Sequence, residues 1–161
     1  MNDKDAKQLA YEATRAHYAA GNPKATDGHT CVYKVVEEFA TEDLPVGAQC
    51  AVGCRISEAT AAQAGGWERL NGLGSLEGLY GERDVARLLV PLFGVRGSDL
   101  WEFNRSIQGL HDSHAEDSSD ELVSRLDELA MNHGLIPAED ARKATLARLS
   151  PEARWALGLD S

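Results

Sequence analysis

Residues 49–56, QCAVGCRI, decide whether this chain contains a sheet, because they follow a strand-like stretch at 31–36, CVYKVV. The earlier stretch is rich in β-branched and aromatic residues, which favours an extended strand. If residues 49–56 are also a strand, Cys50 and Cys54 share one face and the two strands pair; if they open a helix, the same cysteines again share a face. We expect the hairpin. The sequence then predicts an α+β fold, with a small antiparallel hairpin or sheet packed against four to five helices.

The segments on either side of residues 49–56 read as irregular. Residues 37–47 hold four acids and one proline, which is typical of an exposed loop. Residues 57–81 hold six glycines and predict irregular chain with at most one short helical turn. No lysine occurs between Lys34 and Lys143, which excludes a P-loop and a Schiff-base lysine in the central body.

Residues 3–20 predict the first helix. The helical stripe that we expect to pack closely against another element is formed by small and apolar residues, namely Leu9, Ala13, Ala16 and Ala20.

The second half of the chain predicts further helices. Apolar periodicity marks residues 82–93, where Pro91 should bend or end the helix, and Ser98 can cap the next one. Ser118 and Glu121 form a capping box before another helix, which Gly134 should end. Helix-capping signals then continue to the C-terminus.

Length and composition favour one domain, residues 1–161, with a core at 1–136 and a C-terminal helical extension at 137–161. Of 161 residues 43% are apolar, and the formal net charge is −10. A negative chain is a poor direct binder of nucleic acid, which is held by Lys and Arg. The sequence has neither an apolar run long enough to span a membrane nor a signal peptide, and only three cysteines. We therefore expect a cytoplasmic protein without a membrane partner.

Three segments together carry a resemblance: Cys-Val-Tyr at 31–33, CAVGCRISE at 50–58 and IQGLHD at 107–112. Their order resembles a family of small uncharacterised tailed-bacteriophage proteins with Cys-Ala-x-Gly-x-x-Ile and Leu/Ile-Gln-x-x-His-Asp segments, over about residues 5–133. Ser57 departs from the proline usual in that family. The resemblance implies a bacteriophage protein with an accessory role in the host cell cytoplasm, such as host takeover or counter-defence, and carries no activity.

A catalytic set is suggested only weakly, by Cys31 or Cys50 with His111. A nucleophilic site needs a thiolate, a base and a group that orients the base. Asp112 directly follows His111, so on a helix the two side chains point about 100° apart. Buried packing is the favoured interpretation of the cysteines.

A metal site is the second weak hypothesis. Cys50, Cys54, His111 and His114 would supply four zinc ligands if both pairs lay on helices. The spacing of the cysteines is loose for such a site, and we expect no metal and no cofactor.

Acids are concentrated in residues 112–128, with seven acids and a single base, Arg125. A solvated helix face explains part of this concentration. The functional interpretation is a surface that binds a basic partner protein, with the candidate residues Asp112, Glu116, Asp117, Asp120 and Glu121. The loop at 37–43 would add a second acidic strip.

A small-ligand site is the remaining candidate. Aromatic rings and arginines in or beside the glycine-rich segment could hold a nucleotide by stacking and bidentate hydrogen bonds, with the candidate residues Trp67, Arg69, Tyr80 and Arg83.

The sequence thus leads first to an accessory protein that binds a host protein without catalysis. The alternative is a nucleotide-sequestering protein, and the third hypothesis is a cysteine-dependent enzyme. Whether the chain forms a homo-oligomer stays open.

Overall fold

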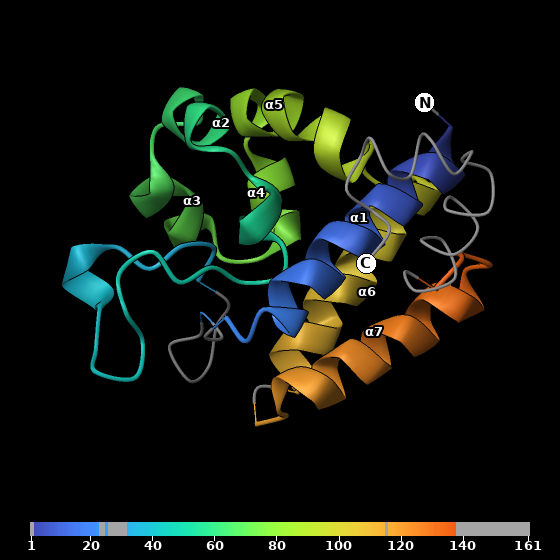
Figure 1. Cartoon of the computed structure of the whole chain (residues 1–161). Helices are drawn as coiled ribbons and strands as arrows, with labels where there is room; N and C mark the ends of the chain where they lie inside the picture. Colours follow the sequence, from blue (N-terminus) through green and yellow to red (C-terminus); the bar gives the residue numbers. More distant parts are fainter. Residues whose placement is uncertain (1, 23–24, 26–31, 115, 138–161) are drawn as a thin grey trace, which may run out of the picture.

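The computed structural model describes residues 2–22, 25, 32–114 and 116–137, and this part of the chain is helical with no β-strand (Figure 1). In chain order the elements are α1 (Asp3–Ala19), the 3-10 helices η1 (Glu37–Phe39) and η2 (Gly53–Arg55), α2 (Glu58–Gln63), α3 (Trp67–Leu73), α4 (Leu76–Gly81), α5 (Arg83–Phe93), α6 (Asp99–Ser113) and α7 (Ser119–Asn132).

The expected hairpin is absent from the described residues, so the α+β prediction is wrong. Only an isolated antiparallel bridge, Lys34 to Gln49, joins the two segments. The Val35 amide donates to the Ala48 carbonyl over 2.8 Å, but the chain turns directly after Cys50 and enters η2. It turns there because Gly53 lies against the backbone of Tyr33, so close that a Cβ on Gly53 would stand 1.8 Å from the Tyr33 carbonyl oxygen.

The glycine-rich segment 57–81 also differs from its prediction, because it forms three short helices, α2 to α4. Ser57 caps α2 and Ser75 caps α4, each by accepting a backbone N–H three residues on. Gly65, Gly66 and Gly74 have positive φ and make the turns between the helices. Each helix is only six or seven residues long, too short for apolar periodicity to reveal it.

Helices α1, α6 and α7 pack against one another as a bundle (Figure 1). Polar contacts fix α1 on both neighbours. Lys7 pairs with Asp99 of α6, and Asp127 of α7 accepts from Tyr11 Oη at 2.5 Å and from Arg15 Nε at 2.9 Å. The bundle therefore combines apolar contacts between its helices with ion pairs and hydrogen bonds at its edges.

The face of α1 that packs against the bundle is not the predicted stripe. Leu9, Ala13, Ala16 and Ala20 are all exposed, and Leu9 retains 55% of its surface. The buried side chains are instead Lys7, Ala10, Tyr11, Thr14 and Tyr18. A large side chain with a polar terminal group can be buried when that group has a hydrogen-bond partner, and a search for apolar residues at helical spacing does not detect it.

The helix ends predicted in the second half are confirmed. Ser98 caps α6 by accepting from the Trp101 amide, and Ser118 with Glu121 forms the capping box of α7. Gly134, at φ 65°, follows the end of α7, and the next residue donates back to the Ala130 carbonyl. Pro91 lies inside α5, two residues before its end.

Two apolar clusters meet at α6. Trp101 belongs to the cluster formed with α2–α5 and the segments around the bridge, whereas Phe103 and Ile107 belong to the cluster within the bundle. No described helix has the length and apolar character to cross a membrane. The predicted extension at 137–161 lies almost wholly outside the described residues.

Candidate functional site

The two described cysteines are packed side chains. Cys50 is buried, and its Sγ accepts from the Gly53 amide at 3.3 Å. Cys54 donates from Sγ to the Ala51 carbonyl at 3.4 Å, and burial raises the pKa of its thiol to about 12. A thiol with so high a pKa supplies little thiolate near neutral pH. Cys31 lies outside the described residues.

His111 lies in the interior of the bundle, 1% exposed. Its Nδ1 is 2.7 Å from Tyr18 Oη, and the two rings lie nearly parallel. The histidine is thus tied to α1.

The four suggested metal ligands are also dispersed. His114 stands at the C-terminal end of α6, 3.5 Å from an Asp117 carboxylate oxygen, whereas Cys50 and Cys54 lie around η2. In the part of the chain that the structure covers, no group of three or more His, Cys, Asp or Glu side chains is placed to hold a metal ion.

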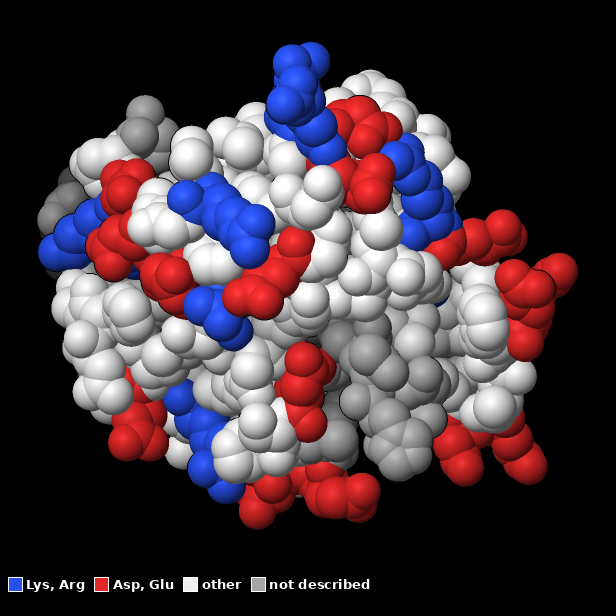
Figure 2. All heavy atoms as spheres, turned by 180° about the vertical axis from the view of Figure 1, so that it is seen from behind, with Lys and Arg blue, Asp and Glu red and all other residues white. Residues whose placement is uncertain are grey.

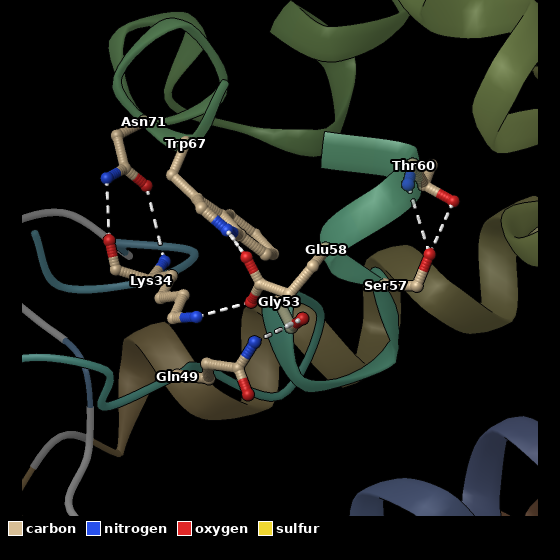
Figure 3. A network of polar contacts seen from close by, with 8 residues as sticks. All are labelled: Lys34, Gln49, Gly53, Ser57, Glu58, Thr60, Trp67 and Asn71. Carbon is tan, nitrogen blue, oxygen red and sulfur yellow. Dashed lines mark hydrogen bonds and ion pairs between the residues drawn. The ribbon is translucent and has the colours of Figure 1, made fainter. Parts of the chain in front are cut away.

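Of the residues predicted to hold a nucleotide, Trp67 belongs to a polar network between α2, α3 and the bridge (Figure 3). Its Nε1 donates to Glu58 at 2.9 Å, and Lys34 pairs with the same carboxylate while lying over the indole ring. Asn71 completes the network by accepting from the Tyr33 amide and donating to the Lys34 carbonyl. Trp67 therefore serves to join these elements.

Arg69 and Tyr80 have structural partners as well. Arg69 donates two bonds to Asp84, at 2.7 and 3.1 Å, and Tyr80 Oη donates to the Gly94 carbonyl at 2.6 Å. Burial raises the pKa of the Tyr80 phenol. Arg83 is exposed at the start of α5. None of the four predicted ligand residues lines either of the two clefts described below.

The acids of the predicted surface between α6 and α7 differ in their contacts: two are bonded within the chain and three are exposed. Asp117 accepts from Arg125 Nε at 2.6 Å, and Glu121 accepts from the Ser118 amide at 2.7 Å as part of the capping box. Asp112, Glu116 and Asp120 remain exposed, and partial desolvation raises the pKa of the Asp112 carboxyl. A shallow cleft of about 370 Å³ lies between these helices and includes His114 and Arg125 in its lining.

The second acidic strip forms a closed loop at residues 36–47, which we call the acidic loop. Its ends are joined because the Gly47 amide donates to the Val35 carbonyl at 2.9 Å. At its tip, Thr41 and Leu44 exchange two backbone hydrogen bonds of 3.0 and 3.1 Å. The part of the loop before the tip contains the 3-10 helix η1. A short loop with joined ends and internal bonds is held in one shape.

The acidic loop has an inner and an outer side. Ala40 and Leu44 pack against the apolar cluster below, whereas Phe39 and Val46 are 54% and 57% exposed. Its four acids are exposed and have no ion-pair partner among the described residues: Glu37, Glu38, Glu42 and Asp43. Figure 2, seen from behind, shows Asp and Glu without Lys or Arg at the right-hand tip, where this loop projects.

Sequence reasoning identified the acids of this loop but not Phe39 and Val46. An aromatic residue directly after two glutamates, in a stretch without any base, was an available signal.

No family model, curated protein or solved structure matches this chain.

Proposed function

We propose that this protein acts without catalysis, by binding a basic partner protein through the acidic loop, with Phe39 as the central apolar contact. The resemblance to bacteriophage proteins suggests the setting, in which the partner is a host protein and the outcome is host takeover or counter-defence in the host cytoplasm. The proposal concerns the loop itself and does not depend on that setting.

The observation that carries the proposal is an exposed aromatic ring on a loop fixed at both ends, among four acids that have no ion-pair partner among the described residues. Binding energy in protein interfaces is concentrated in a few anchors, often aromatic, that enter pockets of the partner. Surrounding charge of one sign accelerates encounter with a partner of the other sign and excludes wrong partners. A fixed loop also loses little conformational entropy when it binds.

The acidic loop is favoured over the acids of α6 and α7 because of their contacts. Asp117 and Glu121 are engaged within the chain, and Asp117 lies beside Arg125, which reduces the local negative charge. No Lys or Arg occurs between Lys34 and Arg55, so nothing in the loop offsets its charge.

The alternatives receive less support. A cysteine-dependent enzyme would need a thiolate, and the pKa of Cys54 is raised by burial. A nucleotide site would need free rings and guanidinium groups, and Trp67, Arg69 and Tyr80 are bonded within the chain.

The test compares three variants of the full chain for binding to a protein recovered from bacterial lysate on the immobilised wild type. Phe39→Ala removes the ring, and a fourfold neutralisation (E37Q, E38Q, E42Q, D43N) removes the charge. The matched control neutralises Glu116 and Asp120 on the other strip. We expect the first two variants to lose at least about tenfold in affinity for the purified partner, and the control to lose less than about twofold.

Salt dependence separates the two contributions. Added salt should weaken binding of the wild type and of Phe39→Ala, and have little effect on the neutralised loop, because screening acts on the charges. A partner that binds both loop variants as tightly as the wild type contradicts the proposal, as does the failure to recover any partner at low ionic strength.

A further inference from the structure

A cleft lies along the exposed side of α1. It has a volume of about 280 Å³ and lies between α1, η2 and the end of α5. The described residues of its lining are apolar apart from Arg55 and Cys54; they are Ala6, Leu9, Ala10, Ala13, Cys54, Arg55, Pro91 and Leu92. The volume lies just below the usual range for small-molecule sites, roughly 300–1,000 Å³.

Among the described residues of this lining, only Arg55 is charged. Its Nη1 donates to Asn104 Oδ1 at 2.6 Å, its Nε reaches the Ala51 carbonyl at 3.4 Å, and its guanidinium lies 4.8 Å from the centre of the Phe93 ring. These three contacts come from α6, from Ala51 just before η2 and from α5, and they hold the group in one orientation.

The same guanidinium has no anionic partner in the part of the chain that the structure covers. Its Nη2 is buried and has no hydrogen-bond partner among the residues that the structure describes, and none of the ion pairs described includes Arg55. Burial lowers the pKa of Arg55 to about 10, and no carboxylate of the described part of the chain opposes that effect. A buried cation without a counter-charge is costly, and buried donors without acceptors are rare in folded proteins.

We propose that this cleft binds a small aliphatic carboxylate, with Arg55 donating hydrogen bonds to the carboxylate oxygens and the apolar walls holding the hydrocarbon chain. A planar guanidinium presents paired N–H donors that match the two oxygens of a carboxylate. The described side chains that α1 and α5 contribute to the lining are all apolar. A monocarboxylate with one apolar chain satisfies both parts of the cleft.

The cleft also accounts for the exposed stripe of α1. Leu9 and Ala13 lie outside the packed face of the helix, and both line this cleft. The small side chain at Ala13 keeps the cleft open, because a larger residue there would fill it. Cys54 contributes a neutral wall, since burial raises the pKa of its thiol to about 12.

The experiment is a calorimetric titration of the full chain with octanoate, below the concentration at which octanoate forms micelles. We expect saturable binding of one octanoate per chain. Two probes test the two halves of the cleft: 1-octanol, which has the chain without the charge, and inorganic phosphate, which has charge without the chain. Each should bind at least about tenfold more weakly than octanoate.

Three variants locate the site. Ala13→Phe fills the cleft from an exposed helix position, and Ala16→Phe places the same ring on an exposed position of α1 that does not line it. We expect the first to weaken octanoate binding by at least about tenfold and the second by less than about twofold. Arg55→Gln should weaken it to a similar extent as Ala13→Phe, and Ala13→Phe keeps the test open if Arg55→Gln does not fold.

The proposal is overturned if octanoate does not bind, if 1-octanol binds as tightly, or if Ala13→Phe binds like the wild type. Binding of octanoate is measured without any partner protein. Its failure therefore leaves the acidic loop unaffected, and failure of the loop variants leaves this cleft unaffected.

Discussion

The bundle of α1, α6 and α7 and the segments around the Lys34–Gln49 bridge differ in what holds their backbones. In the bundle, hydrogen bonds run along each helix and side chains supply the contacts between helices. Around the bridge, side chains replace the missing sheet: the Asn71 amide bonds Tyr33 and Lys34, and Gly53 allows two backbones to touch. We expect single substitutions to reduce stability less in the bundle, where many side chains share the contacts, than around the bridge, where Asn71 and Gly53 supply them.

The strongest test of this difference is Gly53→Ala. The added Cβ would stand 1.8 Å from the Tyr33 carbonyl oxygen, so the bridge must open or η2 must move. We expect a loss of about 3 kcal/mol in the free energy of unfolding, measured by urea titration. The control is Gly72→Ala on an exposed face of α3, where a Cβ meets nothing within 4 Å and should stabilise by about 0.5–1 kcal/mol. Equal effects of the two changes would refute the role of Gly53.

The next largest effect is expected for Asn71→Ala. This change removes the acceptor for the Tyr33 amide and the donor to the Lys34 carbonyl. We expect a loss of about 2 kcal/mol, because backbone groups lose their partners. Hydrogen exchange should accelerate at the amides of residues 33–35 and not in α7. Unchanged exchange at Tyr33 would show that the amide side chain is dispensable.

A bundle change of comparable chemistry should cost less. Ser118→Ala removes the N-cap of α7 and its share of the capping box. We expect a loss of about 1 kcal/mol in urea unfolding, with exchange accelerating only in the first turn of α7. A loss larger than that of Asn71→Ala would reverse the comparison between the two regions.

The smallest effect is a pH dependence at the contact between the two regions. His17 Nε2, at the end of α1, lies 2.8 Å from the Gln49 carbonyl oxygen, and burial lowers the pKa of this histidine. The folded state therefore favours neutral His17. Its contribution to stability is present above the ordinary pKa of about 6.5 and is lost as the pH falls below it. Unfolding at several pH values should show this loss, and His17→Gln should remove it.

The helices of the second half were predictable because their signals are local. Each helix start or end is marked by residues close to it in the sequence: Ser98 begins α6, Ser118 with Glu121 begins α7, and Gly134 follows the end of α7. The hairpin prediction was wrong. The β-branched residues at 32–36 indicate that their own segment is extended, but they do not indicate how far the paired segment around Gln49 stays extended. That length is set by Gly53 against Tyr33 and by Asn71, which is 38 residues from Tyr33 along the chain.

The candidate sites show the same limit. The acids of the loop could be read from the sequence, but their exposure and the partners of Asp117 and Glu121 could not. The sequence did not identify Arg55 as a candidate ligand-binding residue, because the sequence around an arginine does not show whether an acid faces it in the fold.

The Asn71 clamp has a consequence for how copies of this chain meet. A short extended segment with an open side is a template on which another chain can add a strand, and such addition starts aggregation. Here the amide of Asn71 occupies both the N–H and the C=O of Lys34 on the side away from Gln49. One polar side chain thereby protects this short extended segment from self-association.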